Sequence, residues 1–366
     1  MKVLFLTNGP IEHPTSRHRV YQYLDFLKAS GIDATVSPGL SPREYSAVFG
    51  TARRTIPRAI AVNVLTARHR VFDLARAHDF DIVVIQRNIL ATFVPVFELA
   101  LCRHHPAVVF DFDDLIMSPQ FAELIPRTGG GLRQRLFRNR MDLVVKAARQ
   151  IIVGSPFLRE RALELNPNVT LIPTPVDLRR YTLRAEPKPS DQVIIGWKGG
   201  RSAPVYLHPL QPVFEQLARR YGNRFKAVVH GDPDFRRFGP YMEIRPFDLA
   251  TEIEELHRFD IGLMPLADDD FTRGKCAFKA IEYMAAGVPS VSSPVGVICD
   301  IVQHGVNGFL ARSHDEWIEV LSRLIEDVPL RRAVGLAGRR TVEARFSVEA
   351  TGPKLVQTLR TATGDK

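Results

Sequence analysis

The sequence repeats one arrangement, in which a short and continuously apolar segment is followed by an amphipathic one. In the first half the apolar segments are KVLFLTN (2–8), FDIVVIQRN (80–88), AVVFDFDD (107–114) and QIIVGS (150–155). Strands that are apolar on both faces are typical of a parallel sheet covered by helices on both sides. Repeated strand–helix units predict a doubly wound, Rossmann-like α/β domain.

A second series of such segments follows a linker rich in proline and charge, TLRAEPKPSDQ (182–192). Its strands are VIIGWKGG (193–200), FKAVVHGD (225–232), YMEIRPF (241–247), DIGLMPL (260–266), PSVSSPVG (289–296) and GFLARS (308–313), before a helical tail. A chain of 366 residues accommodates two domains. We therefore predict one Rossmann-like domain over 1–182 and a second over 183–347.

The charge and the cysteines restrict where such a chain works and what it contacts. The net charge of +9 is concentrated in two stretches, 53–70 with five arginines and no acid, and 127–149 with seven basic residues and one acid. Such patches suit an anionic surface such as a membrane, a phosphorylated substrate or nucleic acid, but no nucleic-acid motif accompanies them. Three cysteines without paired spacing favour a reducing cytoplasm and argue against a disulfide scaffold or a zinc site.

The strongest candidate site lies around GKCAFKAIEYMAAGVP (274–289), which reads as a glycine followed by a helix. A helix beginning near Lys275 would direct its N-terminal amides and positive dipole end at an anion such as a diphosphate. Lys275, Lys279 and Glu282 would then share one helix face. Glu282 is suited to accept hydrogen bonds from sugar hydroxyls, the alternative being a pair with Lys279.

Further candidates follow other strands, because ligands of open parallel sheets bind at the carboxyl ends of strands. Lys198 and Arg201 follow a strand of the second domain and are suited to neutralise charge on a leaving phosphate. In the first domain, Arg17 and Arg19 suggest contact with a phosphate. The remaining candidates are the turn glycine Gly9 and the neighbouring Ser16.

The segment VVFDFDDLIM (108–117) allows four interpretations. Asp111 and Asp113 follow an apolar strand and could orient a sugar hydroxyl. Paired carboxylates also suit magnesium, a strand followed by Asp-x-Asp is the nucleophile motif of haloacid-dehalogenase-type phosphatases, and an aspartate can cap a helix. We expect no metal site.

The sequence resembles the retaining GT-B glycosyltransferases of family four along nearly its whole length. The resemblance is carried by SRHRVYQYL (16–24), VTLIPTPVDLRRY (169–181), IIGWKGGRSAPVYL (194–207), FSVEATGPKLVQTLR (346–360) and above all FKAIEYMAAGVPSVSSPVGVICDIVQHGVNGFLA (278–311). It implies two facing Rossmann-like domains, with a C-terminal helix (about 348–366) crossing back to the first. It also implies a nucleotide-sugar donor on the second domain, an acceptor on the first, retention of configuration and no cofactor.

By this resemblance Glu282 would hold the nucleotide ribose, and the acceptor's proton would pass to the departing phosphate without a side-chain base. The donor residues it implies are Gly9, Gly196, Gly274, Cys276, Ala277, Phe278 and Glu282. The catalytic ones are Lys198, Arg201, Lys275 and Glu282, and the acceptor-binding ones are Ser16, Arg17, Arg19, Asp111 and Asp113. The phosphate that Arg17 and Arg19 contact would be the donor's or an acceptor's pyrophosphate. The sequence departs from the family at Gly274, where a carboxylate that contacts the donor sugar is usual.

We therefore expect a hexosyltransferase-type enzyme of cell-surface polysaccharide synthesis. It would act in the cytoplasm, on a glycan or lipid-linked acceptor at the inner face of the membrane, which basic helices of the first domain would contact. The missing carboxylate at Gly274 motivates one alternative, a degenerate protein that binds nucleotide sugar without turnover. The other alternative is a phosphatase that uses Asp111 and Asp113.

Overall fold

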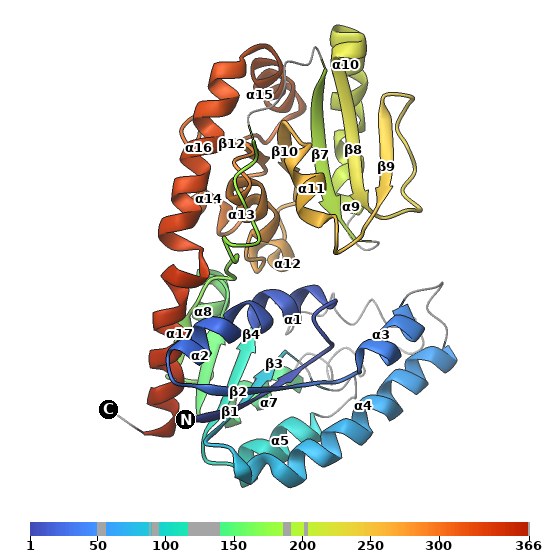
Figure 1. Ribbon diagram of the computed structural model, residues 1–366. Helices are drawn as coiled ribbons and strands as arrows, with labels where there is room; N and C mark the ends of the chain where they lie inside the picture. The colour runs from blue at the N-terminus through green and yellow to red at the C-terminus, as the bar shows by residue number, and fades with distance from the viewer. Residues whose placement is uncertain are drawn as a thin grey trace. The chain divides into compact units, whose positions relative to one another are not determined.

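The computed structural model describes residues 1–49, 56–87, 89, 95–115, 140–185, 192–200 and 204–364. Contacts divide the chain into two compact units (Figure 1). Unit 1 comprises Met1–Pro175, Gly274–Cys276 and Thr351–Lys366, and unit 2 comprises Val176–Arg273 and Ala277–Ala350. The boundary thus falls at 175/176, a little before the position expected from the linker.

Unit 1 contains a six-stranded sheet in the order β2-β1-β3-β4-β5-β6, and every pairing is parallel. The strands are β1 (Lys2–Thr7), β2 (Asp33–Pro38), β3 (Ile82–Gln86), β4 (Val108–Phe112), β5 (Gln150–Val153) and β6 (Val169–Leu171). The central strands β3, β4 and β5 are buried along their whole length, because helices cover both faces of the sheet. The predicted doubly wound sheet is confirmed.

The helices of unit 1 include a break between the first two α-helices. They are α1 (Pro14–Arg19), a 3-10 turn (Tyr21–Tyr23), α2 (Leu24–Ala29), α3 (Pro42–Phe49), α4 (Ile56–Arg76), α5 (Val96–His104), α7 (Arg140–Ala147) and α8 (Pro156–Leu163). The break lies at Val20, whose backbone (φ −128°, ψ −62°) leaves the helical region. Side chains on either side of it donate to carbonyls after β6: Arg19 to Ile172, and Gln22 to Pro175.

The C-terminal helix α17 (Val348–Thr363) returns to unit 1, as predicted. From Thr351 onward its residues group with unit 1, where Tyr23 Oη donates to Thr351 Oγ1 at 2.8 Å. Gly352 lies against the ring of Phe26, and a Cβ there would approach the ring to 2.6 Å. A glycine is therefore required for the helix to pack this closely.

Unit 2 contains a second parallel sheet, in the order β12-β11-β10-β7-β8-β9. Its strands are β7 (Val193–Gly199), β8 (Phe225–Gly231), β9 (Met242–Pro246), β10 (Ile261–Met264), β11 (Ser290–Ser292) and β12 (Phe309–Leu310). Its helices are α9 (Pro204–Leu207), α10 (Gln211–Tyr221), α11 (Glu252–His257), α12 (Asp270–Arg273), α13 (Phe278–Ala285), α14 (Ile298–Ile301), α15 (His314–Glu326) and α16 (Val328–Arg345).

Two apolar cores cover the two faces of this sheet. On one face, Ile195 and Trp197 of β7 pack with residues of α10 and α15. On the other face, Ile194 packs with residues of α11 and α13. Because side chains alternate along a strand, Lys198 shares the α11/α13 face with Ile194.

Within the described ranges, no helix combines the length and the apolar character that a bilayer span requires.

Candidate functional site

A lysine at the carboxyl end of β7 bridges two buried carboxylates. Lys198 Nζ donates to Oε1 of Glu252 and, over 2.6 Å, to Oε1 of Glu282. Glu252 is 0% exposed and Glu282 is 2% exposed. An ammonium group has three protons, so one donor remains for a ligand. Lys198 is therefore the centre of an ion-pair network, in addition to being a candidate to neutralise charge on a phosphate.

A second cation, Arg180, pairs with Glu252 in this network. Glu252 is the first residue of α11, and its Oε2 accepts a hydrogen bond from Arg180 Nη2 at 2.7 Å. The same Nη2 donates to the carbonyl of Leu249 at 3.1 Å. Two acids and two bases therefore balance one another, which is the condition under which buried charges are tolerated.

The two oxygens of Glu282 have different surroundings. Oε1 accepts from Lys198 and also from the buried hydroxyl of Tyr181, at 2.7 Å. Oε2 has no hydrogen-bond partner among the described residues. The carboxylate is thus fixed by one oxygen, and the other can accept a hydrogen bond from a ligand. The cation paired with Glu282 is Lys198, so the alternative pair with Lys279 is wrong.

The helix that carries Glu282 begins later than predicted. α13 starts at Phe278, and the preceding Ala277 has a left-handed backbone (φ 55°) and makes no side-chain cap. A left-handed residue cannot continue an α-helix, so Lys275 lies before the helix and shares no helix face with Glu282. Lys279 is in the first turn, with Nζ 5.9 Å from the ring centroid of Trp197. Any anion site at this helix end therefore lies at Phe278, with Ala277 beside it.

The segment Gly274–Cys276 groups with unit 1. The carbonyl of Gly274 accepts from Ser155 Oγ at 3.3 Å, and Thr174 Oγ1 donates to Cys276 Sγ at 3.4 Å. Burial raises the pKa of Cys276 to about 12, so the thiol stays protonated at neutral pH. These candidates are therefore held by hydrogen bonds to unit 1 residues.

Packing accounts for two of the candidate glycines. A Cβ at Gly196 would lie 2.2 Å from the ring of Phe259, and one at Gly9 would lie 3.0 Å from Cβ of His13. Each glycine admits a side chain of its own unit, so ligand contact is not needed to explain it. Arg201 lies outside the described residues.

In unit 1, Arg19 and Asp111 form a buried ion pair. Arg19 donates through Nε to Asp111 Oδ2 at 3.1 Å and through Nη2 to Oδ1. Its Nη1 donates to the carbonyl of Ile172 at 2.7 Å. Both residues are at most 4% exposed. Every nitrogen of Arg19 thus has a partner within the protein, which argues against contact with a phosphate.

Ser16 and Arg17 are also buried in local hydrogen bonds. Ser16 Oγ contacts His13 Nδ1 at 3.2 Å and donates to Gln86 Oε1 at 3.4 Å. Arg17 Nη1 donates to the carbonyls of Ile11 and Glu12. Both side chains thus stabilise the entry to α1.

Asp113 differs from its neighbours in having no strong partner. Its Oδ1 is buried without a hydrogen bond, and the nearest cation atom, Arg87 Nε, is 3.8 Å away. Arg87 donates instead to Asp114 Oδ2 at 2.9 Å and to Thr15 Oγ1 at 3.1 Å. Among the described residues, no group of three or more histidine, cysteine or acidic side chains is arranged to hold a metal.

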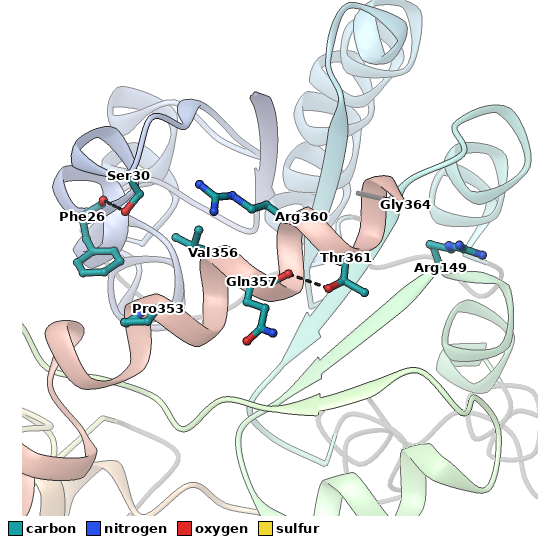
Figure 2. A pocket seen from close by; sticks show the side chains of 9 residues that line it. All are labelled: Phe26, Ser30, Arg149, Pro353, Val356, Gln357, Arg360, Thr361 and Gly364. Atoms are coloured by element: carbon teal, nitrogen blue, oxygen red, sulfur yellow. Dashed lines mark hydrogen bonds between the residues drawn. The ribbon is translucent and has the colours of Figure 1, made fainter. Parts of the chain in front are cut away.

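A groove of unit 1 lies away from these residues. It measures about 1050 Å³ and runs between α2 and α17 (Figure 2). Phe26 and Val356 contribute apolar surface, and Arg149 and Arg360 contribute charge. Arg149 precedes β5, so the groove is at the amino end of that strand, whereas the candidate residues follow carboxyl ends.

Sequence reasoning missed Arg180, Tyr181 and Glu252. Arg180 and Tyr181 are at the end of the segment 169–181, directly before the linker. Polar residues beside a linker are expected to be exposed, so nothing in the sequence indicated that they belong to a site. Glu252 is one of three acids in the short helix α11, and their spacing in the sequence does not show which of them faces the sheet.

Residues 213–327, which include Glu252 and Glu282, match the family model described as glycosyl transferases group 1. Comparison with curated proteins gives no match.

Solved structures share the fold of the whole chain. The sucrose-phosphate synthase of Thermosynechococcus elongatus superposes with a TM-score of 0.72 at 15% identity, with all of both chains covered. A glycosyltransferase from Rickettsia africae gives 0.68 at 13% identity, covering 100% of this chain and 99% of that one. Anabaena HepE in complex with UDP gives 0.65 at 16% identity, covering 99% and 100%. The chain therefore has the GT-B fold, with two Rossmann-like domains.

Proposed function

We propose that the protein is a glycosyltransferase that transfers a sugar from a nucleotide-diphosphate donor with retention of configuration. The match of residues 213–327 and the GT-B fold support a group 1 glycosyltransferase. The observation that carries the proposal is the state of Glu282, with one oxygen fixed by Lys198 and Tyr181 and the other without a partner.

The donor binds to unit 2 in this proposal. Oε2 of Glu282 accepts hydrogen bonds from the ribose hydroxyls. The diphosphate lies at the start of α13, where the helix dipole is positive and the cap residue Ala277 offers no side-chain hydrogen bond. The remaining proton of Lys198 is available to an oxygen of the ligand.

The reaction needs no cofactor and no side-chain base. The acceptor oxygen bonds to the anomeric carbon as the bond from that carbon to the phosphate oxygen breaks. The hydroxyl proton passes to the departing phosphate oxygen on the same face, and a nucleoside diphosphate leaves. Charge that develops on the phosphate is stabilised by the start of α13.

The proposed acceptor is a glycan or lipid-linked sugar used in cell-surface polysaccharide synthesis, at the inner face of the membrane. Helix α4 supports a membrane contact, because Val64, Val71 and Phe72 on it are more than half exposed and Arg68 lies among them. A basic helix with exposed apolar side chains can lie on an anionic bilayer. The basic stretch 127–139 lies outside the described residues.

The catalytically degenerate alternative is kept, because Gly274 stands where a carboxylate was expected. The phosphatase alternative has less support, since Asp111 is bonded to Arg19 through both oxygens and is not free to act as a nucleophile.

A screen of UDP-, GDP- and ADP-linked sugars tests the proposal. We expect one donor class to raise the melting temperature, because a ligand held only by the folded state stabilises it. The same donor should release its nucleoside diphosphate when lipid-linked or free sugar acceptors are added. Binding without release across all acceptors would favour the degenerate alternative, and no stabilisation by any donor would refute the proposal.

A further inference from the structure

The carboxyl end of β4 holds three aspartates and two arginines that face them. Arg19 of α1 binds Asp111 through two nitrogens, and Arg87, which follows β3, binds Asp114 at 2.9 Å. Each arginine is therefore committed to a different aspartate. Asp113 is the one of these three aspartates that accepts no hydrogen bond from either arginine.

Asp113 is buried in spite of its weak pairing. It is 7% exposed, and its Oδ1 has no hydrogen bond. The groups that face it are Arg19 from α1, Arg87 from the end of β3, Asp111 and Asp114 from its own segment, and the protonated thiol of Cys276. Burial, reinforced by Asp114, raises the pKa of Asp113 to about 6 against the opposing effect of Arg87 and Arg19.

The balance of charge in this cluster excludes one class of ligand and favours another. When the three aspartates and the two arginines of this cluster are all ionised, one negative charge remains. A phosphate would meet that charge, and both arginines are already occupied. A neutral hydroxyl or an amine can instead donate to the unpartnered oxygen of Asp113.

A buried carboxylate without a partner is costly, and such groups occur at functional sites more often than elsewhere. The backbone of Arg87 points the same way, since its φ of 58° is a strained value for a residue with a side chain. The Arg87 guanidinium donates to Asp114 and Thr15 and lies 3.8 Å from Asp113, so the Oδ1 of Asp113 is left without a hydrogen bond.

We propose that Asp113 binds a hydroxyl of the acceptor, in a site of unit 1 that takes a neutral polyol and not a phosphate. The inference rests on the proposed function, because the ligand is an acceptor only if the protein is a glycosyltransferase. It adds the chemical class of that ligand. It also replaces the expectation that Arg17 and Arg19 receive a pyrophosphate.

Substituting Asp113→Asn tests the inference first without any ligand. An acid whose pKa is higher in the folded than in the unfolded protein stabilises the fold at low pH, and this stabilisation is lost as pH rises through about 6. Asp113→Asn removes the buried charge, so it should raise the melting temperature at pH 8 and change it little at pH 4.5. The contrasting variant Asp111→Asn breaks the pair with Arg19 and should lower the melting temperature at pH 8. A fall at pH 8 with Asp113→Asn would overturn the inference.

Binding of simple sugars tests the chemical class. At pH 8 and equal concentrations, glucose or glucosamine should raise the melting temperature of the wild type more than that of Asp113→Asn. Glucose 6-phosphate should show no such difference, because its charge opposes that of the site. The inference would be overturned if the wild type and Asp113→Asn differed more in their response to glucose 6-phosphate than to the other sugars. It would also be overturned if they did not differ in their response to glucose and glucosamine.

These measurements need no nucleotide sugar, so a failed donor screen refutes the proposed function without deciding them. Where transfer is observed, Asp113→Asn should raise the KM for the acceptor at least about tenfold, the effect of losing one hydrogen bond to a charged group. An unchanged acceptor KM would contradict the inference while leaving the glycosyltransferase proposal intact.

Discussion

Replacing Glu282 with glutamine will lower kcat/KM for the nucleotide sugar by about a hundredfold. The substitution keeps the shape of the side chain but removes the charge that Lys198 and Tyr181 hold in place. It also weakens the hydrogen bonds that Oε2 would accept from the ribose. A hydrogen bond to a charged group contributes about 1.5 to 3 kcal/mol, and each 1.4 kcal/mol is a factor of ten.

Steady-state kinetics with the donor found in the screen measure this effect. The matched control is Glu343→Gln on α16, where the carboxylate is about half exposed and pairs with Arg339. That variant should keep the wild-type kcat/KM. If both variants behave alike, Glu282 does not contact the donor.

Replacing Lys198 with methionine will destabilise unit 2 by about 3 to 5 kcal/mol, the usual cost of removing one partner from a buried ion pair. Methionine retains most of the apolar stem but leaves Glu252 and Glu282 buried with one cation fewer. Adding Glu252→Gln should recover part of the loss, because the double variant again balances its charges. A control, Glu254→Gln on the exposed side of α11, should have little effect.

Tryptophan fluorescence during urea unfolding reports on this unit selectively. Both tryptophans of the chain, Trp197 and Trp317, are buried in the same core of unit 2. The expected result is an earlier transition for Lys198→Met and a partial return in the double variant. An unchanged transition would show that the network contributes little to stability.

The parallel strands of both units could be predicted because the signal for a buried strand lies in the local sequence. The run IVVI at the start of β3 is apolar over its whole length, and its burial on both faces of the sheet follows from that fact alone. The return of the C-terminal helix to unit 1 came from the family resemblance and is confirmed.

Backbone breaks were not predictable in the same way. Nothing in the local pattern marks Val20 or Ala277 as non-helical, since alanine is the best helix former. Ala277 adopts a left-handed conformation only because the surrounding chain imposes it. The error moved Lys275 onto a helix to which it does not belong.

The partners of buried charges were the hardest part to predict. Glu252 and Glu282 lie 54 and 84 positions from the lysine they share, and Arg19 lies 92 positions from Asp111. A sequence shows that a cationic residue is present, but not whether it forms an ion pair with a carboxylate far away in the chain. Arg19 therefore suggested a phosphate contact, although the fold pairs it with Asp111.

A crystal structure with the donor bound would decide where the nucleotide sugar is held. The account predicts the diphosphate at the start of α13 and a ribose hydroxyl donating to Oε2 of Glu282. A donor bound to unit 1 alone, or a bound donor that leaves Glu282 without contact, would contradict it.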